Sequence, residues 1–152
     1  MSKLWAALLL MFLSGCANLE DSARLGIGMD AATSAVALSG EAVEVNPLIA
    51  SPAALAGSVA IRLVLTEYVD KLPEPERTNY LSALSSLWLG TSAANLVVLV
   101  LASNPAGLII GLLTGLAWWS ETEEDRDIAK GKAMEINTLG YYLQATPVQE
   151  PL

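Results

Sequence analysis

Four apolar stretches follow one another along the chain, separated by helix-breaking or charged residues. They cover residues 25–45, 53–69, 81–102 and 106–120. Proline cannot continue a helix and pushes the residue before it out of the helical region, so the prolines between the stretches mark expected helix ends. The pattern therefore predicts four helices.

The length of these helices indicates a lipid environment. No charged residue occurs between Arg77 and Glu121. Residues 81–102 are enough to cross a hydrocarbon layer of about 30 Å as a helix. Lipid offers no hydrogen-bond partner to free backbone groups, so helices are the expected spanning elements. We predict an all-α membrane bundle of about four helices in two hairpins, residues 25–69 and 81–120.

The composition agrees with this environment and excludes one class of partner. Apolar residues make up 53% of the chain, and the mean hydropathy is +0.48, which is high for a soluble domain. The net charge of −8 argues against nucleic acid, because phosphates are bound by clustered lysine and arginine. We expect membrane lipid as a partner and no nucleic acid.

A weaker helical pattern follows the fourth apolar stretch. Residues 121–152 are acidic, and four apolar residues recur among their charges at roughly helical spacing: Ile128, Ile136, Leu139 and Leu143. Such spacing is typical of an amphipathic helix. Gly131 and Gly140 lower helix propensity. We therefore predict an acidic tail that is partly helical.

The N-terminus has the pattern of a secretory leader. Lys3 precedes an apolar run from Leu4 to Leu13, which is too short to span a bilayer as a helix. The residues at its end resemble the lipobox of bacterial lipoproteins: Leu13, Ser14, Gly15 and Cys16.

The resemblance to a lipobox implies how this region is processed. Residues 1–15 would be a signal peptide in which Leu13, Ser14 and Gly15 are recognised, and Cys16 would carry a covalent lipid. Residues 16–24 would form a short polar tether. Cys16 is the only cysteine, which excludes an internal disulfide. No other cofactor is expected.

The lipidated residue also predicts an orientation. We expect the lipid anchor on the periplasmic face of the cell inner membrane. Apolar hairpins favour this membrane, because extraction would expose lipid-facing helices to water. The outer membrane is the alternative, since Ala17 resembles a signal for export.

Polar residues interrupt the first apolar stretch on one helical face, which comprises Asp30, Thr33, Glu41 and Glu44, with Asn46 at the following turn. A carboxylate at the centre of a bilayer costs about 2.5–3.5 kcal/mol on insertion scales, so this face should point into the bundle. Folding the hairpin about residues 49 and 50 brings Arg62 level with Ala37 and close to Glu41.

Three interpretations of this polar face are open. In a structural role, Arg62 pairs with Glu41 or Glu44, Asn46 caps the turn, and Asp30 and Thr33 cap the helix near its periplasmic end. In a transport role, the face binds a proton or cation. In an enzymatic role, the carboxylates bind a divalent metal. The chain has no histidine, so the enzyme is the weakest of the three; we expect no catalytic residue and no metal site.

A second resemblance concerns the same polar face. The order of its residues resembles the first-helix signature of a family of small bacterial and archaeal polytopic membrane proteins of unknown function: Asp30, Thr33, Gly40, Glu44, Asn46 and Pro47. An asparagine in a later helix, as at Asn95, is also similar. The resemblance implies a polytopic helical fold and brings no activity with it.

Three glycines in the last apolar stretch, Gly107, Gly111 and Gly115, form a double GxxxG pattern. Small residues at this spacing allow membrane helices to approach closely. We favour the preceding helix as the partner, with another protomer as the alternative.

The sequence as a whole favours a small membrane-embedded lipoprotein that acts as a structural or accessory subunit, or scaffold, of a cell-envelope complex. Its expected protein partners are further copies of the chain or other membrane proteins. The alternative function is a transport component that binds a proton or cation at Asp30, Glu41, Glu44 and Arg62.

Overall fold

The structure, a computed structural model, describes residues 18–39, 51–101 and 104–145. Every regular element within these ranges is an α-helix, which confirms the all-α prediction for this part of the chain. The helices are α2 (Leu19–Ser39), α3 (Pro52–Asp70), α4 (Glu76–Leu101), α5 (Asn104–Glu121) and α6 (Glu123–Ala145).

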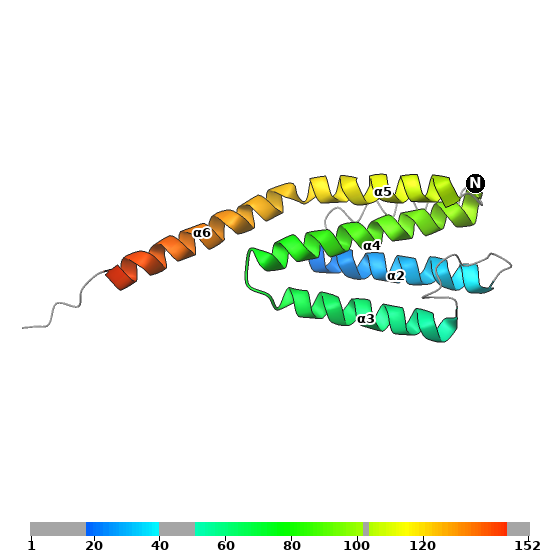
Figure 1. Ribbon diagram of the computed structural model, residues 1–152, viewed down its shortest axis with the longest axis horizontal. Coiled ribbons are helices and arrows are strands. Elements are labelled where there is room, and N and C mark those ends of the chain that lie inside the picture. Colours follow the sequence, from blue (N-terminus) through cyan, green and yellow to red (C-terminus); the bar gives the residue numbers. More distant parts are fainter. Residues whose placement is uncertain (1–17, 40–50, 102–103, 146–152) are drawn as a thin grey trace, which may run out of the picture.

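Four of these helices lie side by side in the order α3, α2, α4, α5 (Figure 1). The direction of the chain reverses between α2 and α3, between α3 and α4, and between α4 and α5. One end of the bundle therefore gathers the starts of α2 and α4 and the ends of α3 and α5. From this end α6 extends away from the bundle (Figure 1).

The first helix begins at Leu19, earlier than the predicted start at residue 25. Asn18 explains the early start, because its Oδ1 accepts a hydrogen bond from the Asp21 backbone N–H at 2.8 Å. This is the usual geometry of an N-cap. Most of residues 16–24, which were predicted to be a tether, are therefore helical.

The predicted capping role of Asp30 and Thr33 is wrong, because both lie inside α2. The Thr33 hydroxyl donates to the backbone carbonyls of Met29 and Asp30, at 3.0 Å each. A threonine inside a helix commonly satisfies its hydroxyl in this way.

The other helix ends follow local chemistry. Ser51 caps α3 by accepting a hydrogen bond from the Ala54 N–H at 3.1 Å, and Pro52 occupies the first turn, where its missing N–H does no harm. The α3–α4 connection is held by Arg77, whose Nε donates to Asp70 Oδ1 at 2.8 Å. α4 begins at Glu76, five residues before the predicted residue 81.

Close packing of α4 on α2 depends on a glycine. A Cβ at Gly26 would lie 3.0 Å from the backbone nitrogen of Leu89, so a larger residue would push the helices apart. The Ser92 hydroxyl donates to the Gly26 carbonyl at 2.8 Å across this contact. Small residues and interhelical hydrogen bonds of this kind are typical of helix packing in membranes.

Close packing of α4 on α5 depends on the GxxxG glycines. A Cβ at Gly111 would lie 2.6 Å from the Gly90 carbonyl oxygen, and one at Gly115 would lie 2.9 Å from the Ser86 carbonyl oxygen. Gly107 likewise leaves no room for a side chain beside Ala94. The partner of this glycine face within the chain is thus the preceding helix.

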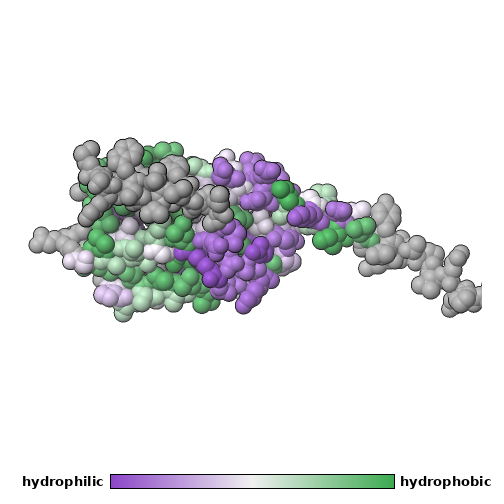
Figure 2. Space-filling model, turned by 180° about the vertical axis from the view of Figure 1, so that it is seen from behind, coloured by the Kyte–Doolittle hydropathy of each residue, from purple (hydrophilic) through white to green (hydrophobic). Residues whose placement is uncertain are grey.

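The outer surface of the bundle is apolar while its interior contains many hydroxyl groups. Large apolar side chains on α3 and α5 are more than half exposed: Ile61, Val64, Tyr68, Leu108, Leu112 and Leu116. Several serines are fully buried: Ser22, Ser82, Ser85 and Ser92. Hydrophilic residues gather at the end from which α6 projects (Figure 2). By length and composition alone, two of the described helices, α3 and α4, could cross a membrane.

Candidate functional site: a polar network between three helices

A polar network formed by Asp30, Arg62 and Asn95 joins three helices. Asp30 lies in α2, Arg62 in α3 and Asn95 in α4. Arg62 Nη1 donates to Asp30 Oδ2 in an ion pair, and Asn95 Nδ2 donates to Asp30 Oδ1 at 2.7 Å. Each carboxylate oxygen of Asp30 is therefore bonded to a different neighbouring helix.

The charges of the network are largely removed from solvent. The side chain of Asp30 is 4% exposed and that of Arg62 is 19% exposed. Removing either charge from water is unfavourable, and the attraction between the two offsets this only when their hydrogen bonds are also satisfied. A guanidinium is suited to such a site because its charge is permanent and its donors have a fixed geometry.

Buried hydroxyl groups surround the network. Asn95 Nδ2 also lies 3.5 Å from the Ser34 hydroxyl, which is buried in α2. In α3, the buried Thr66 hydroxyl donates to the Arg62 carbonyl at 3.0 Å. The Ser34 contact extends the network within α2, whereas the Thr66 hydroxyl bonds to the backbone of its own helix, α3.

The partner of Arg62 differs from the predicted one. Folding about residues 49 and 50 would place Arg62 opposite Ala37, whereas Arg62 meets Asp30, about two turns closer to the start of α2. The predicted partners Glu41 and Glu44, together with Asn46, lie outside the described residues.

Glu67 is a second acid that faces α2, and it has a partner of its own. Its carboxylate accepts a hydrogen bond from Arg24, and both side chains of that pair are about half exposed. Each of the two acids is therefore matched with its own arginine.

The structure brings together only some of the residues predicted for the polar face. Asp30, Arg62 and Asn95 meet, whereas the Thr33 hydroxyl bonds within its own helix. Ser34 and Ser92 were not predicted to take part. The missed signal is a recurrence of small or polar residues every four positions along α2: Ser22, Gly26, Asp30 and Ser34. All four are buried, and this stripe marks the face of α2 that packs in the bundle.

The chemistry available to the network is limited by how fully Asp30 is engaged. Among residues 18–39, 51–101 and 104–145, no cluster of three or more histidine, cysteine, aspartate or glutamate residues could hold a metal ion. Both oxygens of Asp30 accept hydrogen bonds from neighbouring side chains. The arrangement is therefore suited to fixing the relative positions of helices.

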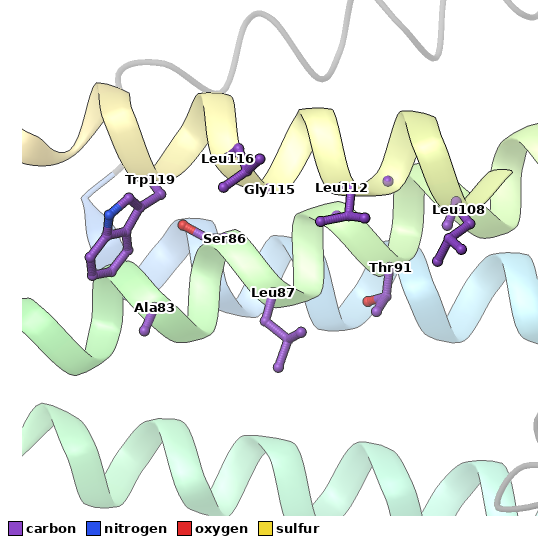
Figure 3. Close-up of a pocket in the computed structure, with 12 residues that line it drawn as sticks. Ala83, Ser86, Leu87, Thr91, Leu108, Leu112, Gly115, Leu116 and Trp119 are labelled. Atoms are coloured by element: carbon purple, nitrogen blue, oxygen red, sulfur yellow. The ribbon is translucent and has the colours of Figure 1, made fainter. Parts of the chain in front are cut away.

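A second feature of the bundle is an apolar groove between α4 and α5, with a volume of about 430 Å³. Trp119 and Ala83 lie at one end of the groove, and Leu108 and Thr91 lie at the other (Figure 3). No charged side chain lines it.

Cys16 and the signal residues Leu13, Ser14 and Gly15 lie outside the described residues. Their predicted roles therefore stay predictions. Comparison of the chain with protein-family models, with curated proteins and with solved structures finds no match.

Proposed function

We propose that this chain is a small membrane-embedded lipoprotein that serves as a structural or accessory subunit, or scaffold, of a cell-envelope complex. Its helices and a lipid on Cys16 would hold it in the cell inner membrane, with the lipid on the periplasmic face. The observation that carries the proposal is the distribution of polarity: an ion pair lies inside the bundle and large apolar side chains lie outside it.

This distribution suits lipid better than water. The exposed apolar side chains of α3 and α5 form a surface of the kind that soluble monomers rarely present. In lipid the same side chains are favourably placed, and an ionised side chain should face the bundle interior and pair there. The Asp30–Arg62 pair meets that requirement.

The proposal extends to four spanning helices in two hairpins, α2 with α3 and α4 with α5. α3 and α4 have a suitable length and composition. The 21 residues of α2 and 18 residues of α5 would reach about 32 and 27 Å at about 1.5 Å per residue, close to the thickness of a hydrocarbon core. In this arrangement the polar end of the bundle and α6 lie on the side of Cys16.

A scaffold role is supported by what the network does within the bundle. Asp30 links α2 to both α3 and α4, and each of its two carboxylate oxygens accepts one of these hydrogen bonds. Such a site orders helices and leaves little capacity to bind and release a ligand. We therefore expect its loss to reduce the amount of folded protein.

Membrane fractionation of the wild type and of Cys16→Ala tests the proposal. The wild type should incorporate labelled palmitate and stay in the inner membrane after an alkaline carbonate wash. Cys16→Ala should lose the label and still resist the wash, because its helices span the bilayer. Release of Cys16→Ala by carbonate would show that lipid is the only anchor. Sedimentation of the wild type with the outer membrane would refute the proposed location.

Binding of a proton or cation is the second candidate function. The observation that favours it is the buried Asp30 carboxylate with the Asn95 amide and the Ser34 hydroxyl nearby. This function predicts that Asp30→Asn folds to wild-type levels and loses a pH- or cation-dependent phenotype. The scaffold function instead predicts that the abundance of Asp30→Asn falls, because Arg62 then lacks its counter-charge.

A further inference from the structure

The groove between α4 and α5 is shaped for a long apolar ligand. Its floor includes Gly90, Gly111 and Gly115, and its rim carries exposed leucines of both helices. Between Leu108 and Trp119 the helix axis advances by about 16 Å, at about 1.5 Å per residue. This is close to half of the hydrocarbon core, about 15 Å, which is the depth that the acyl chains of one leaflet fill.

A buried cation stacks on Trp119, the residue at one end of the groove. The guanidinium of Arg126, in α6, stacks on the ring of Trp119 at 3.7 Å from the ring centroid. Its Nη1 donates to the Trp119 carbonyl and to the Thr122 hydroxyl, both at 2.7 Å. These acceptors are uncharged, and Arg126 is only 6% exposed. Within the described residues Nε and Nη2 of Arg126 donate no hydrogen bond.

Arg126 differs from the other arginines in its lack of a carboxylate partner among the described residues. Arg24, Arg62 and Arg77 each pair with at least one carboxylate, whereas Arg126 forms no salt bridge within residues 18–39, 51–101 and 104–145. A buried charge without a counter-charge at ion-pair distance is unfavourable. The nearby carboxylates of Glu123, Glu124 and Asp127 line another pocket. An anion placed beside Trp119 would supply the missing charge.

We propose that the α4–α5 groove and Arg126 together bind an anionic phospholipid. One acyl chain lies along the groove from Trp119 toward Leu108, and the headgroup phosphate accepts hydrogen bonds from the free donors of Arg126. The proposal rests on the proposed function, since it requires the bundle to lie in a bilayer. It adds a preference for negatively charged lipid that an apolar surface alone would not have.

The test uses lipids whose acyl chains carry bromine, which quenches tryptophan fluorescence at short range. The full chain is reconstituted into phosphatidylcholine vesicles that contain a low mole fraction of brominated phosphatidylglycerol or, separately, brominated phosphatidylcholine. Trp119→Phe identifies the part of the signal that comes from Trp119. For the wild type, half-maximal quenching of Trp119 should need about tenfold less brominated phosphatidylglycerol than phosphatidylcholine, as expected for hydrogen bonds to a charged group.

Three variants separate the parts of the site. Arg126→Gln should abolish the preference for phosphatidylglycerol. Lys132→Gln, which removes the same charge from an exposed position of α6, should keep it. Ala83→Phe, which fills the Trp119 end of the groove, should reduce quenching by both lipids. Circular dichroism of each variant in the same vesicles identifies any variant that has not folded.

Equal quenching of the wild type by the two brominated lipids would overturn the proposed site, as would an equal loss of preference in Arg126→Gln and Lys132→Gln. Vesicle flotation distinguishes this failure from failure of the proposed function. A chain that floats with the vesicles and shows no preference refutes only the lipid site. A folded chain that does not float refutes membrane embedding and the lipid site together.

Discussion

At the scale of single residues, Asp30 is the side chain on which the arrangement of α2, α3 and α4 depends. Its two oxygens accept from Arg62 and Asn95, and its side chain is almost fully buried. Removing one member of a buried ion pair is more damaging than removing both, because the charge left behind has no partner. This asymmetry leads to a test of the network.

We expect Arg62→Leu to lower the free energy of unfolding by about 3–5 kcal/mol, the usual effect of leaving a buried charge unpaired. The double variant Asp30→Leu, Arg62→Leu should recover most of this loss. Unfolding of the purified protein in mixed detergent micelles, followed by circular dichroism as the denaturing detergent increases, measures both values.

The matched control is Arg24→Leu, which breaks the pair between Arg24 and Glu67. Those side chains are 45% and 50% exposed, and exposed pairs contribute at most about 1 kcal/mol. A loss in Arg24→Leu as large as that in Arg62→Leu would contradict the assignment of the network, and so would simple additivity in the double variant.

The members of the network could be named from the sequence, but their pairing could not. Asp30 and Arg62 were prominent because charged residues are rare in apolar stretches. Asn95 was noticed only through a resemblance to other membrane proteins. The pairing of Arg62 with Asp30 was missed because the sequence does not reveal where the chain reverses between α2 and α3. A shift of a few residues there changes which side chains are level.

At the scale of elements, α4 is the centre of the bundle because it carries two small-residue faces. One face receives Gly26 of α2, and the other receives the glycines of α5. The second contact follows from a recognisable GxxxG pattern between helices that are neighbours in sequence. The contact of α2 with α4 joins helices that run in the same direction, with α3 between them in the chain. A prediction of two hairpins gives no reason to expect it.

Two glycine substitutions should have opposite effects on the stability of the bundle. Gly111→Ala should lower the thermal unfolding temperature, because its Cβ would lie 2.6 Å from the Gly90 carbonyl oxygen and overpacking of this kind typically costs about 1–3 kcal/mol. Gly57→Ala, in α3, meets nothing within 4 Å. It should raise stability by up to about 1 kcal/mol through helix propensity alone.

Thermal unfolding of both variants in the same detergent measures this difference directly. Because each change adds one methyl group to a helix, propensity is matched and only the contact differs. A stabilising Gly111→Ala would mean that α4 and α5 are not closely packed in the protein.

Both ends of α3 were predictable, whereas the starts of α2 and α4, which are polar, were placed too late. The prediction of 53–69 differs from α3 by one residue at each end, because proline precedes and follows that stretch. The start of α2 was placed too late because polar residues looked like a tether. They form a capped first turn, since Asn18 satisfies a backbone N–H and Glu20 and Asp21 favour the helix dipole.

At the scale of the whole molecule, the charged residues of the described bundle gather at one of its two ends. The end that gathers the starts of α2 and α4 and the ends of α3 and α5 holds the ion pairs of Arg24 and Arg77 and leads into the charged helix α6. Among the residues that the structure describes, the part of the bundle beyond Asp30 and Arg62 is mainly apolar. A membrane protein with this distribution should place the charged end at one surface of the bilayer.

Labelling of single cysteines tests this orientation. Lys71→Cys lies between α3 and α4 at the charged end, Lys132→Cys lies in α6, and Ser51→Cys lies at the opposite end before α3. All three positions are exposed. Because α2 begins only three residues after Cys16, a lipid on the periplasmic side predicts that Lys71→Cys and Lys132→Cys react with a membrane-impermeant maleimide in intact spheroplasts. Ser51→Cys should react only after detergent is added.

The chain without an added cysteine measures any reaction of Cys16 itself, which acylation should prevent. Reaction of Ser51→Cys in intact spheroplasts together with Lys71→Cys would mean that α3 does not cross the membrane, since these residues flank that helix. Reaction of Ser51→Cys alone would invert the bundle and contradict a periplasmic lipid on Cys16. Only protection of the apolar end, with reaction at both positions of the charged end, agrees with a bundle that spans the bilayer and projects α6 into the periplasm.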